Sequence, residues 1–257
     1  MPRVAREKSS TGVYHVILRG HNQQPIFKEE EDAQRFLHTL EKYQKSGDYL
    51  VFAYCLMANH VHLLIKEEQT ELGTIMKRIG ASFVYWYNKK HERCGNLFQD
   101  RFRSEAVEDE AYFLTVLRYI HQNPVKAGLV EEPASYSWSS YREYLREYLG
   151  ERKMIEVDYV LGLFHPQREK AITAFREFHN TSESAPCLEV IDEKRVYKDD
   201  EAAKLIKELC SVSCCSKLKA AGEAEMSSHL KLLKEQGLST RQIARLTGIN
   251  RRAILKA

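Results

Sequence analysis

The 257-residue sequence contains no unbroken apolar run of the roughly 18 residues that a membrane-spanning helix needs. The basic N-terminal residues 1–8 are not followed by an apolar segment, so no secretory signal is expected. No internal repeat or low-complexity tract is present. These absences favour a cytoplasmic globular protein without a membrane partner.

Paired metal-binding cysteines are also missing. The six cysteines form no C-x-x-C pair, and Cys214 and Cys215 are adjacent, which suits neither a structural zinc site nor a disulfide framework. We expect reduced thiols. A metal pair formed by Cys210 and Cys214, one helical turn apart, is the less favoured alternative.

Charge is distributed unevenly along the chain. The net charge is only +3, but residues 216–257 hold nine Lys or Arg against three Glu, so the rest of the chain is net negative. A basic tail indicates an anionic partner such as nucleic acid. The length allows one substantial core and a small second domain. We expect a main domain over 1–150, a helical extension and linker over 151–215, and a basic C-terminal region over 216–257.

The main domain shows alternating strand and helix patterns. Alternation and β-branched residues predict strands at 12–19, 49–57, 60–66 and 99–107. Apolar stripes at helical spacing predict helices at 30–46, 72–90 and 110–122, the last ended by Pro124 and Gly128. This order predicts an α+β fold, a ferredoxin-like antiparallel sheet with helices packed on one face.

Patterns after residue 150 are helical and weaker. Two stretches, 159–163 and 169–179, precede the linker-like residues 180–186. Three short helices are predicted in the tail, at 228–235, 240–247 and 251–256, with Ser239 and Gln242 as a capping box. The C-terminal region is therefore expected to be all-α.

A histidine pair, His60 and His62, lies on one predicted strand. Residues two apart on a strand point to the same face, so both imidazoles can share a divalent ion while Val61 faces the core. The spacing by itself is weak support, because ten histidines produce such pairs by chance. Two half-exposed strand histidines remain an alternative.

Tyr119 and Asn123 lie four residues apart in the predicted helix before Pro124. One face of that helix therefore presents a phenol and an amide oxygen together. A buried helix aromatic and a C-terminal cap are the alternatives for these two residues. His121 is expected on the helix surface rather than as a further ligand.

Several ordered motifs resemble the IS200-like, single-tyrosine transposases of the HUH endonuclease superfamily, close to the REP-associated tyrosine transposases. They are YHVILRG-HN, LMANHVHLL, FQDRFRSE and RYIHQNPVKAGLV, within about residues 8–145. The resemblance implies that His60, His62 and Asn123 hold Mg²⁺ or Mn²⁺ and that Tyr119 is the nucleophile. Many relatives carry glutamine at the position of Asn123, a change that keeps the ligand oxygen.

The resemblance also implies a reaction and a substrate. Tyr119 would attack a phosphodiester of single-stranded or hairpin DNA, form a 5′-phosphotyrosine and free a 3′-hydroxyl, and a second 3′-hydroxyl would reverse the step. Metal coordination would withdraw charge from the scissile phosphate. The general base for Tyr119 is not apparent.

Further arginines and one asparagine are candidate DNA contacts, although ordinary solvated surface explains each of them as well. Arg19 and Asn22 follow the first strand, where relatives place such groups. Arg101 and Arg103 alternate onto one predicted strand face, where both can hold phosphates. Arg78 lies with Tyr85 and Lys89 away from the apolar stripe of its helix, as a candidate surface for single-stranded DNA.

The tail sequence GLSTRQIARLTGINRRAILKA resembles the helix-turn-helix of invertases and resolvases. That resemblance places Arg251 and Arg252 at the start of a short recognition helix, facing duplex DNA. A helical packing or dimerisation unit is the alternative.

We therefore expect a metal-dependent tyrosine DNA transposase or nicking endonuclease, acting as a monomer or a homodimer. The competing hypothesis is a non-catalytic DNA-binding regulator derived from the same family. A metal-dependent RNA nuclease or binder is a third reading.

Overall fold

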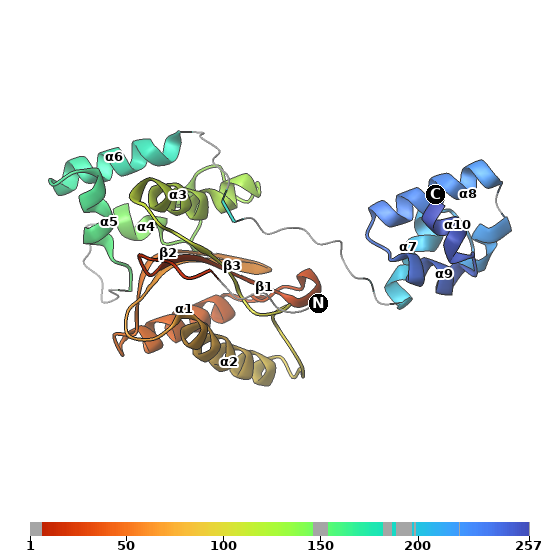
Figure 1. Cartoon of the computed structure of the whole chain (residues 1–257), viewed down its shortest axis with the longest axis horizontal. Helices are drawn as coiled ribbons and strands as arrows, with labels where there is room; N and C mark the ends of the chain where they lie inside the picture. Colours follow the sequence, from red (N-terminus) through yellow and green to blue (C-terminus); the bar gives the residue numbers. More distant parts are fainter. Residues whose placement is uncertain are drawn as a thin grey trace. The chain divides into compact units, whose positions relative to one another are not determined.

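The structure, a computed structural model, describes residues 7–145, 154–181, 187–188, 197, 199–220 and 222–256. It divides into two compact units, Met1–Val190 and Ile191–Ala257, each with its own buried core (Figure 1). This division differs from the three expected segments, because the middle segment is shared between the two units. Within the described residues, no helix is both long and apolar enough to cross a bilayer.

The first unit is built on one antiparallel sheet with the strand order β2-β3-β1-β4. Its strands are β1 (Val13–Arg19), β2 (Tyr49–Met57), β3 (His60–Glu67) and β4 (Arg103–Ala106). Helix α1 (Glu30–Gln44) connects β1 to β2, and helix α2 (Leu72–Lys90) connects β3 to β4. The β-α-β-β-α-β order is the ferredoxin-like arrangement, which confirms the predicted α+β class.

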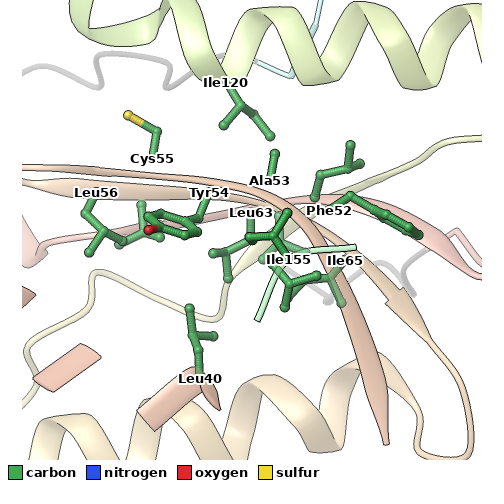
Figure 2. Packing of buried hydrophobic residues seen from close by; sticks show 14 of the residues in the cluster. Leu40, Phe52, Ala53, Tyr54, Cys55, Leu56, Leu63, Ile65, Ile120 and Ile155 are labelled. Atoms are coloured by element: carbon green, nitrogen blue, oxygen red, sulfur yellow. The ribbon is translucent and has the colours of Figure 1, made fainter. Parts of the chain in front are cut away.

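Helices cover both faces of this sheet, whereas the sequence predicted helices on one face. Leu40 of α1 lies on the same side as Leu56 (Figure 2). Ile120 of α3 (Glu110–Lys126) lies on the opposite side, with Cys55. Strand β2 is buried along nearly its whole length, and a strand buried on both faces needs a second covering layer.

This second layer continues into the segment that follows α3. It comprises η2 (Pro133–Ser135), α4 (Tyr141–Leu145), α5 (Val157–Phe164) and α6 (Arg168–Asn180). His121 of α3 connects several parts of this layer: its Nδ1 lies 2.9 Å from Nε2 of His179, and its Nε2 lies 2.8 Å from Ser140 Oγ. His179 donates from Nδ1 to the carbonyl of Phe175. The prediction that His121 lies on the helix surface was wrong, because this network buries it completely.

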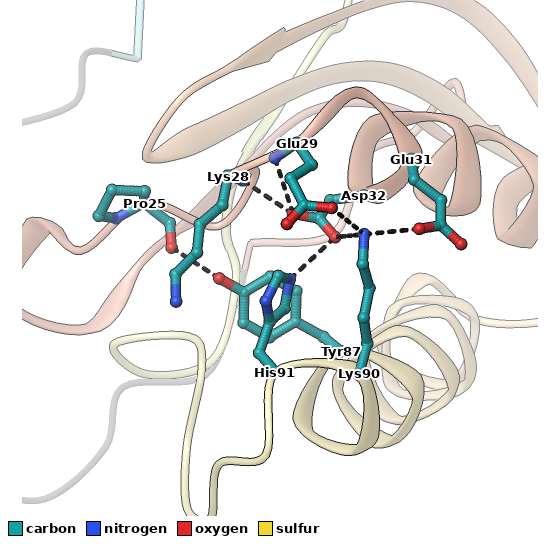
Figure 3. A network of polar contacts seen from close by, with 8 residues as sticks. All are labelled: Pro25, Lys28, Glu29, Glu31, Asp32, Tyr87, Lys90 and His91. Atoms are coloured by element: carbon teal, nitrogen blue, oxygen red, sulfur yellow. Dashed lines mark hydrogen bonds and ion pairs between the residues drawn. The ribbon is translucent and has the colours of Figure 1, made fainter.

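The first turn of α1 is tied to the end of α2 (Figure 3). Asp32 is fully buried and accepts hydrogen bonds from the backbone nitrogens of Lys28 and Glu29. Lys90 and His91 of the α2 terminus lie 2.9 and 3.0 Å from its Oδ1. Burial acts to raise the pKa of Asp32, but the hydrogen bonds from Lys90, Lys28 and His91 lower it below its usual value. The two helices are thus held by a paired, buried carboxylate.

The second unit is entirely helical in its described residues. Its elements are α7 (Asp199–Leu209), η3 (Cys215–Ala220), α8 (Glu223–Glu235), α9 (Thr240–Thr247) and α10 (Arg251–Lys256). Helices α9 and α10 have the predicted bounds, and α8 begins earlier than predicted. Ser239 caps α9 by accepting from the backbone nitrogen of Gln242 at 3.1 Å. The predicted capping box is incomplete, because the Gln242 side chain donates to the carbonyl of Tyr197 instead.

Candidate active site

Strand β3 presents His60 and His62 to the face of the sheet covered by α3. His62 lies opposite Cys55 in the β2–β3 register, and Cys55 points toward α3 (Figure 2). His62 is fully buried, while His60 at the start of the strand is partly exposed. The two ring centroids are 5.0 Å apart with an interplanar angle of 86°. The predicted strand alternation therefore brings both rings to one place.

Helix α3 carries Tyr119 and Asn123 one turn apart, on the same side of the helix. The sequence predicted that the helix ends before Pro124, but it continues to Lys126, with Ala127 as its C-cap. Pro124 is buried, so its packing offsets the backbone hydrogen bond that a proline cannot make. Asn123 is consequently an interior helix residue, which excludes the alternative that it is only a cap.

The amide of Asn123 lies beside the same ring nitrogen, Nε2, of both histidines. Nε2 of His60 is 3.4 Å from Oδ1 of Asn123, and Nδ2 of Asn123 is 3.2 Å from Nε2 of His62. Two imidazole nitrogens and one amide group thus converge from β3 and α3. Imidazole with an oxygen ligand is a donor set that divalent metals accept in open sites.

The other ring nitrogen, Nδ1, of each histidine is also engaged. Nδ1 of His60 lies 2.7 Å from Oδ1 of Asn59, and Nδ1 of His62 lies 3.0 Å from Nε2 of His15. His15 comes from β1, where Ile17 is the direct partner of His62. Sequence analysis did not select His15 or Asn59. The alternation of β1 places His15 on the face of Ile17, but only the register of β1 with β3 brings it to His62.

The buried imidazoles of this site are neutral. Burial lowers the pKa of His15 to about 3. Burial, together with the neighbouring His15 and His60 rings, lowers the pKa of His62 well below its ordinary value. A neutral imidazole keeps one ring nitrogen with a free lone pair, which is the form that binds a metal ion.

Tyr119 is half-buried against the histidines. Its ring meets those of His62 and His15 edge-on, with centroid distances of 5.5 and 5.7 Å. Nζ of Lys126, two turns further along α3, lies 4.8 Å from the centroid of the Tyr119 ring. A phenol, a cation and the His-His-Asn group therefore occupy one region between β3 and α3.

The residues present fit a divalent ion only if Asn123 takes part. Across the described ranges, no group of three or more His, Cys, Asp or Glu side chains is arranged to hold a metal. His15 does not complete such a group, because its Nε2 faces Nδ1 of His62 rather than the side where Nε2 of His62 points. The amide oxygen of Asn123 is the third donor that this geometry offers.

Arg19 and Asn22 lie at the His60 end of the sheet. Arg19 is the direct β1 partner of His60. Asn22 follows in the short helix η1 (His21–Gln23), with φ of 52°. This turn is held against the β2–β3 hairpin, because the backbone nitrogen of Gly20 donates to the carbonyl of Asn59 at 2.8 Å.

Arg103 lies at the start of β4, opposite Ile17 and therefore on the sheet face that carries His62. Arg101 lies before the strand, because β4 begins at Arg103 and not at residue 99 as predicted. The expected alternation of Arg101 and Arg103 on one strand face is therefore absent. Strand pairing with β1 is limited to four residues of β4.

Arg78 is separate from the histidines. It lies on α2, which covers the sheet face opposite α3 (Figure 1), and it pairs with Asp48 at 3.0 Å. Tyr85 and Lys89 are likewise exposed on α2. The structure does not bring this group of residues to Tyr119.

Arg251 and Arg252 belong to the second unit. Both are exposed at the start of α10, and the backbone nitrogen of Arg252 donates to Oδ1 of Asn250 at 2.9 Å. Ile254 points into the core of the unit. Helix α10 thus presents a basic outer side.

Comparison with known proteins shows what the first unit is similar to. Residues 8–123 match the family model described as "Transposase IS200 like". A REP-associated tyrosine transposase of Escherichia coli K12 is 22% identical over 138 residues, which are 52% of this chain and 78% of the relative. A Haemophilus influenzae relative grouped with the same transposases is 28% identical over 100 residues, 35% of this chain and 57% of the relative.

A solved structure shares the fold. A REP-associated tyrosine transposase bound to a REP hairpin superimposes with a TM-score of 0.50 at 17% identity, over 61% of this chain and 98% of that chain. This likeness concerns the fold of the first unit. Residues 8–123, somewhat less than half of the chain, are thus similar to the IS200-like transposases in sequence and to a REP-associated tyrosine transposase in fold.

Proposed function

We propose that the protein is a metal-dependent DNA transposase and nicking endonuclease that cuts and rejoins DNA through a 5′-phosphotyrosine. The observation that carries this proposal is the convergence of His60, His62 and Asn123 beside Tyr119. A tyrosine next to two imidazoles and an amide, in a domain similar to IS200-like transposases, favours phosphodiester transesterification.

His60, His62 and Asn123 would hold Mg²⁺ or Mn²⁺ through two Nε2 atoms and the amide oxygen. When bound, such an ion supplies charge withdrawal from the scissile phosphate and leaves open positions for phosphate oxygens. Asn123 now donates from its amide nitrogen to His62, so ligation requires the amide to turn its oxygen toward the two rings.

Tyr119 is the proposed nucleophile. Its oxygen attacks phosphorus, the bond from phosphorus to the 3′-oxygen breaks, and the phenol proton is lost while the departing 3′-oxygen takes one up. The products are a 5′-phosphotyrosyl bond and a free 3′-hydroxyl. A second 3′-hydroxyl reverses these steps, so rejoining needs no external energy. Lys126 places a cation over the ring, where it offsets negative charge on the phenolate and on the phosphate.

The proposed substrate is single-stranded or hairpin DNA. The solved relative is described as bound to a REP hairpin, and its fold matches this chain over 61% of its length. Arg19, Asn22 and Arg103 lie at or beside the strands that carry the histidines, so they are the proposed phosphate contacts. Arg101 is exposed in the loop two residues before β4 begins, and it is proposed as a further phosphate contact.

The second unit is proposed to bind duplex DNA through α9 and α10. Three residues separate these helices, and the exposed Arg251 and Arg252 begin the second of them. A helix of this kind contacts the major groove or its phosphates through its N-terminal residues. Its six residues provide little length for base recognition.

The test uses the full chain with labelled single-stranded oligonucleotides taken from inverted repeats that flank the gene. Incubation with Mn²⁺ should yield a denaturation-resistant protein–DNA adduct, and the adduct should disappear with EDTA. Tyr119→Phe should keep DNA binding and lose the adduct, while Tyr85→Phe, a change on exposed α2, should leave it intact. Undiminished cleavage by Tyr119→Phe would overturn the proposal. Absence of any adduct with the wild-type chain would favour a non-catalytic regulator.

A further inference from the structure

The rings of His60 and His62 each have a hydrogen-bonding contact at Nδ1, the nitrogen that does not face Asn123. His60 is held by its sequence neighbour Asn59, at 2.7 Å, on the hairpin turn. His62 is held by His15 of another strand, at 3.0 Å, in a fully buried position. The rings of His15 and His62 are stacked, with centroids 5.2 Å apart and an interplanar angle of 26°.

The proposed ligation fixes the tautomer of His62. A neutral imidazole has one protonated and one unprotonated nitrogen. A metal ligand must carry its lone pair on the ligating nitrogen, and for His62 that nitrogen is Nε2, which faces Asn123 at 3.2 Å. The proton of His62 is therefore on Nδ1, and it is donated to Nε2 of His15. His15 in turn carries its own proton on Nδ1.

The last nitrogen in this series of hydrogen bonds, Nδ1 of His15, lowers the stability of the fold because it has no partner in the described part of the chain. Nδ1 of His15 is buried and has no hydrogen-bond partner among the described residues. An unsatisfied buried donor destabilises a fold, whereas an apolar side chain on a strand buried on both faces would not. Packing therefore does not explain why position 15 is a histidine. The need for an acceptor of the His62 proton does explain it.

We infer that His15 is a positioning residue, which keeps the proton of His62 on Nδ1 and its Nε2 lone pair directed at the metal position. The inference rests on the proposed function, in which His62 is a metal ligand. Partners behind a ligating histidine set its tautomer and orientation, and their loss lowers metal affinity by about 10- to 100-fold. Oδ1 of Asn59 lies at the corresponding nitrogen of His60, 2.7 Å from Nδ1.

The first measurement needs no substitution. Long-range ¹H–¹⁵N spectra of the histidine rings of the full chain should show His62 as the Nδ1–H tautomer, with His62→Gln used to identify its signals. A predominant Nε2–H tautomer of His62 in the wild-type protein would overturn the inference, whether or not any variant folds.

The second measurement is Mn²⁺ binding without DNA, followed by the loss of the free-ion electron paramagnetic resonance signal. His15→Phe removes the acceptor and should weaken Mn²⁺ binding by about 10- to 100-fold. His15→Gln, whose Oε1 reaches the position of Nε2, should stay within about threefold of wild type. Val16→Ala, which removes buried volume on the opposite face of β1, serves as the packing control and should leave Mn²⁺ affinity unchanged.

A wrong metal centre and a wrong role for His15 give different results in these measurements. If the wild-type chain binds no Mn²⁺, the proposed metal centre is wrong, and the tautomer spectra still judge the hydrogen bond. If wild type and folded His15→Phe bind Mn²⁺ equally, the positioning role is wrong while the metal centre stands.

Discussion

Nδ2 of Asn123 donates to Nε2 of His62 across a distance of 3.2 Å, joining helix α3 to strand β3 at the candidate metal position. We predict that Asn123→Ala lowers Mn²⁺ affinity by about tenfold or more, because one of three ligands is removed. Asn123→Gln keeps the amide oxygen and should retain both Mn²⁺ binding and adduct formation. Calorimetry with Mn²⁺ checks the first outcome. Equal affinity of Asn123→Ala and wild type would remove Asn123 from the ligand set.

Lys126 should contribute to the rate of adduct formation rather than to folding, because it is exposed and contacts the ring of Tyr119. A cation over an aromatic ring at an exposed site is worth about 0.5–1 kcal/mol, so Lys126→Gln should slow adduct formation by about two- to fivefold. Lys126→Arg keeps the charge and should stay near the wild-type rate. Single-turnover kinetics on a labelled oligonucleotide measure both. A Lys126→Gln rate equal to that of wild type contradicts the role.

The stability of the first unit should fall in mild acid because of His179. Burial lowers its pKa to about 4 in the folded chain. The unfolded value is about 6.5, so the unfolded chain binds more protons below that pH and the free energy of unfolding falls as pH falls. The contribution of His179 is complete above about pH 6.5 and is lost toward about pH 4, at up to about 1.4 kcal/mol per pH unit.

Urea unfolding across this pH window tests the effect. His179→Gln keeps an acceptor for Nδ1 of His121 but does not titrate, so its unfolding free energy should vary less with pH than that of wild type. The same pH dependence in both proteins would show that His179 is not the group responsible.

Gly20 should be intolerant of a side chain. A Cβ at this position would overlap the backbone carbonyl oxygen of Gln24, within the turn that contacts Asn59. Gly20→Ala must shift this turn, so we expect a loss of about 1–3 kcal/mol in unfolding free energy. Gly80→Ala is the matched control, because its Cβ meets nothing within 4 Å in helix α2 and should stabilise by about 0.5–1 kcal/mol. Thermal melts that show no difference between the two variants would contradict the prediction.

Arg251 and Arg252 should affect duplex DNA binding without affecting cleavage of single strands. In the full chain, Arg251→Ala with Arg252→Ala should weaken binding to a duplex and reduce the slope of log affinity against log salt by about two, if each arginine meets one phosphate. Arg241→Ala, on the preceding helix, provides a variant that loses charge elsewhere in the unit. An unchanged salt slope in the double variant would exclude these contacts.

Much of the site could be predicted from local patterns. The alternation of β3 places His60 and His62 on one face, and the helical spacing of Tyr119 and Asn123 places them on one side of α3. Helix α2 and strand β2 have the bounds that their apolar patterns predict. Such features depend on the backbone geometry of a single element, which the sequence of that element dictates.

The local patterns did not predict which strands pair or which helices pack against which face of the sheet. The pairing of β1 with β3 brings His15 into contact with His62. The second helical layer buries His121, and within that layer α3 places Asn123 beside His60 and His62. Arg78, chosen for its place on a helix, lies on the other side of the sheet.

The sequence by itself thus determined which residues of one strand and one helix face the same way. Only the tertiary structure decided which of those faces meet, because strand register and helix layering follow from burying the apolar surface of the whole chain at once.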